Sequence, residues 1–166
     1  MISVLTLKNL REVVFGAEDG VISVLVVTTA LAIGGAGTAY VLLAGVATSA
    51  AGMVSMGAGA YLGSRAEQDA IGLKVSLSNP LKDGIVMAVS FLLASTIPLG
   101  PFVLLGATDY ASGLAVVVSL LSLFSLGTAK GILVRKSMWR QGLEIMMVGA
   151  LSAACGFAVG ELAPTI

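Results

Sequence analysis

Acidic residues inside long apolar segments are the first candidates for functional side chains in this sequence. Glu12, Glu18 and Asp19 occur in the string REVVFGAEDGVISVLVV, where Gly20 follows Asp19. Glu12 precedes Asp19 by seven residues, so the two share one helix face about two turns apart. Carboxylate oxygens bind hard and borderline divalent cations and can also carry protons. The three residues predict a cation or proton path, and the alternative for Glu12 and Glu18 is a position among the lipid headgroups.

Two methionines in the next apolar segment add a softer type of ligand. Met53 and Met56 occur in AGMVSMGAGAYLGSRAEQD and are one helical turn apart. A thioether is a weak, soft ligand that suits ferrous iron or a similar transition metal better than magnesium or calcium. Methionine is also common in apolar packing, which is the alternative interpretation. Gly59 and Gly63 form a Gly-x-x-x-Gly pair, a pattern that allows helices to approach closely.

The remaining acids of interest lie near the ends of the apolar segments. Glu67 and Asp69 either gather cations at the mouth of a pore or lie in a solvated loop. Glu144 is a candidate for the metal entry or proton path, and the alternative is a salt bridge with Arg140, four residues earlier on the same face. The chain has one cysteine and no histidine, which excludes a disulfide framework and zinc-finger spacings. We expect neither an enzyme nor a resident cofactor, because no nucleotide-binding loop or nucleophile–base pairing is present.

The composition indicates that these residues are positioned by membrane-spanning helices. Of the 166 residues 57% are hydrophobic and 11% are charged, with a mean hydropathy of +1.03, whereas a soluble domain has about 25% charged residues. No charge occurs between Gly20 and Ser64, a stretch about 65 Å long as one helix, although the hydrocarbon core is only about 30 Å thick. The segment must therefore fold back, and Gly34-Gly35-Ala36-Gly37 is the predicted break.

The second long apolar stretch is interrupted only by Asp109. Its predicted break lies near Pro98-Leu99-Gly100-Pro101, followed by Gly106 to Asp109. We therefore predict an all-α polytopic membrane protein that forms a single transmembrane domain over residues 1–166. The five predicted spans cover residues of about 13–34, 37–64, 82–105, 109–129 and 141–162.

The distribution of basic residues predicts the orientation of the spans. Cytoplasmic loops carry the excess of Lys and Arg. With a cytoplasmic N-terminus and an outside C-terminus, the cytoplasmic side holds all nine basic residues, which are Lys8, Arg11, Arg65, Lys74, Lys82, Lys130, Arg135, Lys136 and Arg140. The net charge is zero, so no nucleic-acid partner is expected. The expected location is the lipid bilayer, and the cell membrane if the chain is prokaryotic.

Four strings in order resemble the vacuolar iron transporter family over residues of roughly 10–162: FGAEDGVIS, AGMVSMGAGAYLGSRAEQDA, NPLKDGIVMAVSFLLASTIPLGPFVLL and GLEIMMVGALSAACGFAVG. The resemblance implies five-helix homodimers with the translocation path between the subunits. It implies export of ferrous iron and often manganese from the cytosol in exchange for protons. It also implies a metal site formed by the residues that match Asp19 and Met56, with Glu12 at the acidic position near the cytoplasmic start of the path.

The connection between the second and third spans departs from the family pattern. Many members similar to the plant proteins insert a glutamate-rich cytosolic metal-binding domain there, whereas residues 65–80 are too few to form one and include only Glu67 and Asp69 as acids. The chain is thus identified as a short member that lacks this domain. The leading hypothesis is a proton-coupled exporter of Fe2+ or Mn2+. The alternatives are a membrane scaffold or partner subunit that does not transport, and a proton-coupled transporter of another solute.

Overall fold

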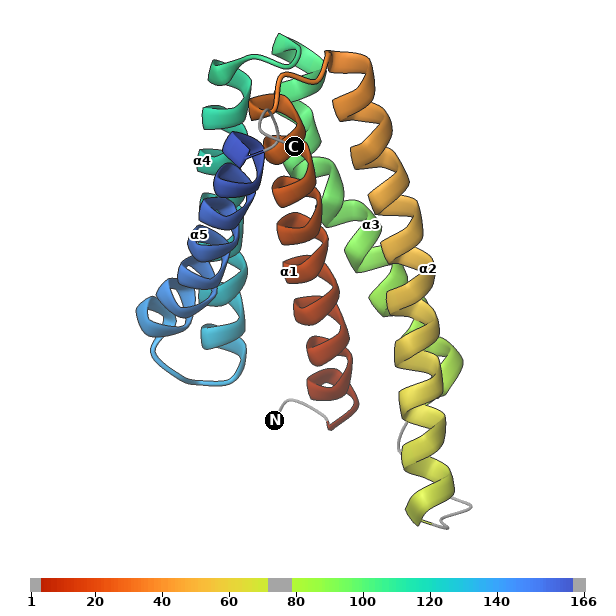
Figure 1. Ribbon diagram of the computed structural model, residues 1–166. Coiled ribbons are helices and arrows are strands. Elements are labelled where there is room, and N and C mark those ends of the chain that lie inside the picture. Colours follow the sequence, from red (N-terminus) through yellow and green to blue (C-terminus); the bar gives the residue numbers. More distant parts are fainter. Residues whose placement is uncertain (1–3, 72–78, 163–166) are drawn as a thin grey trace.

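The computed structural model describes residues 4–71 and 79–162, which form a bundle of five α-helices. The helices are α1 (Val4–Ile33), α2 (Thr38–Ile71), α3 (Pro80–Leu105), α4 (Asp109–Leu133) and α5 (Met138–Leu162). They run alternately up and down, and the described ranges contain no strand (Figure 1). Each helix is long and apolar enough to cross a bilayer. The predicted fold class is confirmed: the chain is an all-α, multi-pass integral membrane protein.

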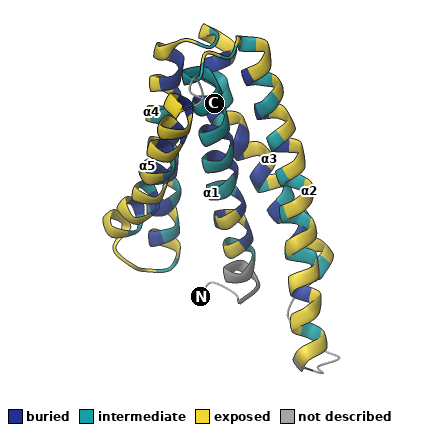
Figure 2. Ribbon diagram, in the orientation of Figure 1, coloured by how far each residue is buried: buried dark blue, intermediate teal, exposed yellow. Residues whose placement is uncertain are grey.

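Helix α1 is the centre of the bundle. It contacts each of the other four helices, whereas α2 contacts only α1 and α3. In the most apolar stretch of α1 44% of the residues are buried, compared with 17% in that of α2. Figure 2 shows exposed residues along the whole length of α2, while α4 and α5 form a hairpin on the other side of α1. Helix α2 therefore lies at the edge of the subunit with a long uncovered face.

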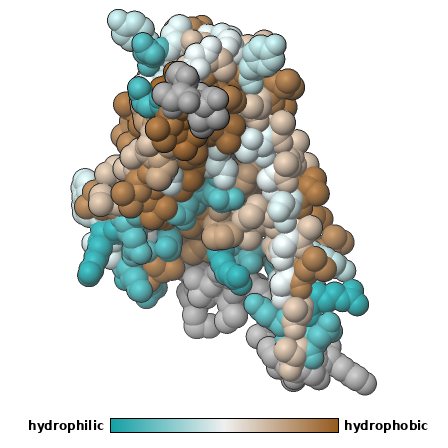
Figure 3. Space-filling model, viewed as in Figure 1, coloured by the Kyte–Doolittle hydropathy of each residue, from teal (hydrophilic) through white to brown (hydrophobic). Residues whose placement is uncertain are grey.

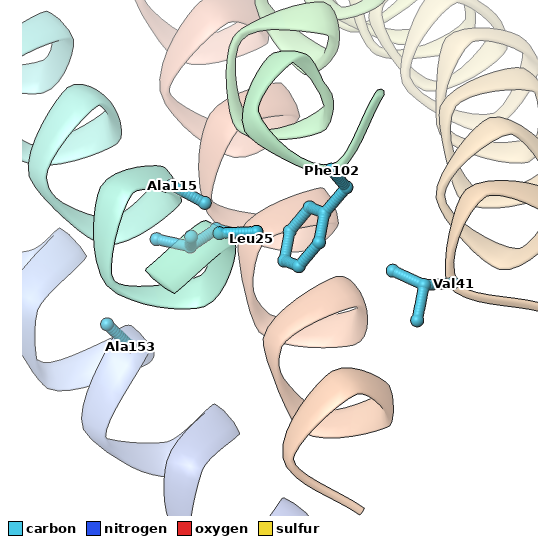
Figure 4. Packing of buried hydrophobic residues seen from close by; sticks show 6 residues of the cluster. Leu25, Val41, Phe102, Ala115 and Ala153 are labelled. Atoms are coloured by element: carbon cyan, nitrogen blue, oxygen red, sulfur yellow. The ribbon is translucent and has the colours of Figure 1, made fainter. Parts of the chain in front are cut away.

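One core cluster receives a side chain from every helix. Leu25, Val41, Phe102, Ala115 and Ala153 come from α1 to α5 in that order, and all five are buried (Figure 4). Lipid tails are as apolar as these side chains, so close packing rather than exclusion from water holds such helices together. The cluster therefore joins the helices in the half of the bundle farther from the start of α1.

Glycines set the close approach between α1 and α3. A Cβ atom added at Gly16 would lie 2.6 Å from the carbonyl oxygen of Met87, and one added at Gly20 would overlap the backbone of Phe91. Small residues at a spacing of four allow two helix backbones to approach closely. The Gly16–Gly20 pair thus fixes the register of α1 on α3, immediately beside Asp19.

The first predicted break is confirmed, whereas the second is partly wrong. Helix α1 ends at Ile33, and Gly35 has a positive φ of 82° in the turn before α2. Helix α3, however, runs through Pro98 and Pro101. It ends at Leu105, where Gly106 has a φ of 71°. Proline fixes φ near the helical value, and buried prolines are tolerated in transmembrane bundles because neighbouring groups can satisfy the freed backbone carbonyls.

The helices extend beyond several of the predicted spans. Helix α1 begins at Val4 rather than near residue 13, and α2 continues to Ile71 rather than ending near residue 64. Backbone hydrogen bonding does not stop where the apolar sequence stops, so a helix continues through the headgroup region with polar side chains. Figure 1 shows the end of α2 projecting beyond the other helices.

Polar side chains gather at one end of the bundle. Because the helices alternate in direction, the start of α1, the end of α2 and the α4–α5 connection all lie at this end (Figure 1). Figure 3 shows hydrophilic side chains concentrated there and hydrophobic ones above. The basic residues whose side chains are described belong to these parts of the chain and to the start of α3: Arg11, Arg65, Lys82, Lys130, Arg135, Lys136 and Arg140. Lys74, predicted on the same side, lies outside the described residues.

Candidate functional site

Asp19 and Met56 line the same groove on the exposed side of α1 and α2. The groove has a volume of about 330 Å³. Its lining residues come from α1, α2 and α3 and are Asp19, Ser23, Thr48, Ala51, Gly52, Ser55, Met56 and Phe91. Two residues that the sequence predicts as metal ligands are therefore brought together by the packing of α2 beside α1. Met53 is not among the lining residues.

The backbone contact between α1 and α3 explains how Asp19 reaches this groove. Gly16 and Gly20 face α3 at Met87 and Phe91. Successive helix residues point about 100° apart, so the residue before Gly20 is turned away from the α3 contact. Asp19 is thereby directed to the side of α1 where α2 lies.

Hydroxyl groups accompany the carboxylate and the thioether in the groove. The Oγ atom of Ser23 donates a hydrogen bond to Oδ1 of Asp19 at 3.2 Å. Ser55 adjoins Met56, and Thr48 lies on the same lining about two turns away. The sequence interpretation missed these three hydroxyls, because serine and threonine are common in apolar helices. The one available signal was the spacing of four between Asp19 and Ser23.

Phe91 forms the floor of the groove. Its side chain is 1% exposed, and a Cβ atom added at Gly52 would overlap its ring. The absence of a side chain at Gly52 therefore gives the ring its place, and an apolar surface lies beneath the polar groups. Such a surface removes water from one side of a bound cation, which strengthens its interaction with the carboxylate.

Within the described residues, no group of three histidine, cysteine, aspartate or glutamate side chains could hold a metal ion. The Asp19–Met56 groove supplies one carboxylate, one thioether and neutral hydroxyls in a single subunit. Fe2+ and Mn2+ accept this mixture of hard and soft donors, although one subunit provides few strong ligands.

Glu12, the third predicted ligand, is in a different environment. Its side chain is 2% exposed, and it is not among the residues that line the groove. It lies about two turns before Asp19 on α1. Its role as a ligand stays a prediction.

Glu18 and Glu144 belong to another part of the molecule. Glu18 lines a groove of about 350 Å³ between α1 and α4, together with Leu10, Arg11, Val14, Phe15, Lys130 and Val134. Glu144 accepts a hydrogen bond from Nε2 of Gln141 at 2.9 Å. Neither Glu18 nor Glu144 lines the groove that contains Met56.

The acids at the end of α2 are exposed. Nη1 of Arg11 lies 3.9 Å from Oε1 of Glu67, and the two side chains are 72% and 58% exposed. Exposed ion pairs of this kind contribute little stability. Asp69, two residues further along α2, is exposed as well. Both acids are thus accessible to cations, and one of them has a basic neighbour on α1.

Comparison with known proteins gives consistent matches over the helical bundle. The VIT family pattern matches residues 10–76 and 70–161. Vacuolar iron transporter 1 of Arabidopsis thaliana is 23% identical over 212 residues, which covers 92% of this chain and 85% of that protein. Vacuolar iron transporter 1 of Eucalyptus grandis is 20% identical, with 91% and 85% covered. The vacuolar iron transporter of Centaurea cyanus is 21% identical, with 93% and 87% covered.

The matched segments include all the residues of the groove. The two matched segments overlap at residues 70–76, which include the last two residues of α2 and part of the connection to α3. The alignment with the Arabidopsis thaliana protein is longer than this chain of 166 residues, so that relative has residues that are absent here. Because the family pattern covers most of the sequence in the order of the helices, the chain belongs to the VIT family.

Proposed function

We propose that this chain is a membrane transporter of divalent transition-metal ions, which exports Fe2+ or Mn2+ from the cytosol in exchange for protons. The observation that carries the proposal is the presence of Asp19 and Met56 in one groove between membrane-spanning helices. The named relatives, which are vacuolar iron transporters, support metal transport as the general function.

The donor set of the groove favours a transition metal as cargo. The carboxylate of Asp19 supplies charge, and the thioether of Met56 favours a borderline ion over magnesium or calcium. The hydroxyls of Ser23, Thr48 and Ser55 replace part of the hydration shell of the ion. A cation that enters the groove therefore finds one strong oxygen ligand, one sulfur and several weaker oxygens.

Competition at the carboxylate provides the coupling to protons. Metal ions bind the deprotonated form of a ligand, so metal and proton exclude each other at Asp19. If the site faces the cytosol and the outside in turn, a metal ion leaves in one direction and a proton returns in the other. The basic end of the bundle is then the cytoplasmic end, in agreement with the positive-inside rule.

The uncovered face of α2 supports a homodimer. Small residues recur on this face at a spacing of four, at Ala47, Ala51, Ser55, Gly59 and Gly63, and all five are exposed. A Cβ atom added at Gly59 or Gly63 would meet no other atom within 4 Å, whereas Gly45, Gly52 and Gly57 on the same helix pack closely against α1 or α3. Small residues at this spacing are typical of helix–helix interfaces in membranes.

The small-residue face and the groove share Ala51 and Ser55. A second copy that packs on this face therefore covers the groove as well. Symmetric pairing of two copies brings a second Asp19 and a second Met56 to the same interface. This arrangement supplies the additional strong ligands that the groove of one subunit does not offer.

Flux measurements in liposomes test the proposal. The purified protein is reconstituted with an iron-sensitive dye inside the vesicles, and a pH gradient is imposed. We expect proton-driven Fe2+ or Mn2+ flux that is lost in Asp19→Ala and weakened in Met56→Leu. Met53→Leu is the matched control, since it changes a methionine one turn from Met56 that does not line the groove, and it should retain flux.

Three results would contradict the proposal. Asp19→Ala that transports as well as the parent would show that the site is misassigned. Absence of both flux and Asp19-dependent metal binding would favour a scaffold that does not transport. Flux of an organic solute with no effect of Met56→Leu on metal tolerance in cells would favour a different cargo.

A further inference from the structure

A buried polar contact joins α2 and α3 outside the groove. Oγ of Ser64 donates a hydrogen bond to Oδ2 of Asp83 at 2.7 Å. Ser64 is 7% exposed and Asp83 is 2% exposed. An ionisable residue within a membrane-spanning segment is costly to bury and generally has a function. The sequence interpretation gave Asp83 no role.

The partner of the Ser64 hydroxyl differs from that of most hydroxyls in the bundle. Serine and threonine in a helix usually donate to a backbone carbonyl three or four residues earlier. Ten described hydroxyls do so, at Thr28, Thr29, Ser49, Ser95, Thr96, Ser112, Ser122, Ser125, Thr128 and Ser152. Ser64 instead donates to a residue 19 positions away on another helix. Its contact therefore fixes one helix relative to another.

A second close contact between α2 and α3 lies beside Met56. A Cβ atom added at Gly84 would lie 2.7 Å from the carbonyl oxygen of Gly57, and one added at Gly57 would lie 2.9 Å from Cβ of Ala88. Gly57 directly follows Met56, and Ser64 lies two turns further along α2. Two fixed points on one helix determine both its tilt and its rotation. A rotation of α2 about its axis would turn Met56 away from the groove, so these two contacts help to keep the Met56 side chain in place.

The contacts between α1 and α3 show which residue of α1 lies at the level of Asp83. Gly16 and Gly20 pack against Met87 and Phe91, and α1 and α3 run in the same direction (Figure 1). One turn earlier on each helix, this register brings Glu12 to the level of Asp83. Both side chains are 2% exposed. The three helices that form the groove therefore each carry a buried polar side chain toward this end of the bundle, which are Glu12, Ser64 and Asp83.

We propose that Asp83 is a positioning residue for metal binding, which holds α2 through Ser64 so that Met56 faces Asp19. This inference rests on the proposed transport function. Asp83 is not among the residues that line the groove, so it would not contact a metal ion bound there. Asp83 acts by keeping Met56 in position. Loss of Asp83 should therefore change the preference between Fe2+ and Mn2+ in the same way as loss of the Met56 thioether.

The test compares substrate preference rather than flux alone. Asp83→Ala and Ser64→Ala should raise the KM for Fe2+ about tenfold, as is usual for a residue that supports a metal ligand, with little change in kcat. The ratio of KM for Fe2+ to KM for Mn2+ should change as it does in Met56→Leu. In a Met56→Leu background, Asp83→Ala should have no further effect on this ratio.

Conservative variants and a matched control separate positioning from general damage. Asp83→Asn and Ser64→Thr keep an acceptor and a hydroxyl, so both should retain the KM of the parent. Ser95→Ala removes a buried hydroxyl of α3 that bonds only within its own helix, and it should leave the KM ratio unchanged. Ser64→Ala carries the test if Asp83→Ala does not fold, because it removes a single oxygen atom.

A spectroscopic measurement provides a readout independent of transport. In protein labelled with 13C at the methionine methyl groups, Mn2+ at a concentration near its dissociation constant for the parent should broaden the Met56 signal of the parent, and this broadening should be clearly weaker in Asp83→Ala. Equal KM increases for both ions, additive effects with Met56→Leu, or an Asn variant as impaired as the Ala variant would overturn the inference. If the parent shows no Asp19-dependent flux, the proposed function itself fails. Normal Asp19 dependence with an unchanged Asp83→Ala variant overturns only the positioning role.

Discussion

Substitution of Gly16 by alanine tests the helix contact that directs Asp19 into the groove. The added Cβ atom would lie 2.6 Å from the carbonyl oxygen of Met87, whereas ordinary van der Waals contact begins at 3.4 Å. The clash is with backbone, so rotation of a side chain cannot relieve it, and α1 must move away from α3. Overpacking of this kind costs about 1–3 kcal/mol, of which the better helix propensity of alanine offsets about 1 kcal/mol.

The assay compares Gly16→Ala with Gly113→Ala in unfolding and flux measurements. A Cβ atom at Gly113 would meet no other atom within 4 Å, so this control should match or slightly exceed the stability of the parent. Gly16→Ala should have a free energy of unfolding up to about 2 kcal/mol below that of the parent, and about 1–3 kcal/mol below that of Gly113→Ala, which gains the same helix propensity without the clash. It should also lose most of its metal flux, since a displacement of about 1 Å in a site can cost a hundredfold in rate.

Equal stability of the two variants would refute the reasoning, because it would mean that α1 and α3 are not in backbone contact at Gly16. Lower stability with normal flux would refute only the link between this contact and the position of Asp19.

Three further substitutions test separate features of the structure. Gly59→Leu should convert the proposed dimer to a monomer in light-scattering measurements with little change in subunit stability, because a Cβ atom at Gly59 would meet no other atom of the subunit within 4 Å; a dimer that survives would contradict the α2 interface. Gly52→Ala should reduce metal flux at least tenfold, since its Cβ displaces the Phe91 ring, and normal flux would show that the floor is not needed. Arg11→Ala should change the free energy of unfolding by less than about 1 kcal/mol and increase initial uptake at low ionic strength, because it removes the positive charge 3.9 Å from Glu67; slower uptake would contradict cation capture by Glu67.

The candidate site was predictable in part. Asp19 could be selected from sequence because a carboxylate is costly within an apolar helix, and Met56 because it matches the family pattern in the next span. Ser23, Thr48 and Ser55 could not, since hydroxyls in such helices usually bond to their own backbone. Glu18 and Asp19 are adjacent in sequence, yet they line different grooves, because a helix turns about 100° per residue.

The sequence by itself determined that five apolar helices cross the membrane and that the described basic residues share one end. Both properties follow from the cost of placing charges and unpaired backbone groups in hydrocarbon, which acts on each segment separately. Only the tertiary structure decided which sides of these helices meet. Contacts such as Gly16 with Met87 and Ser64 with Asp83 depend on rotation and register between helices. The hydropathy of a segment carries no such information, because in lipid every apolar side is equally acceptable.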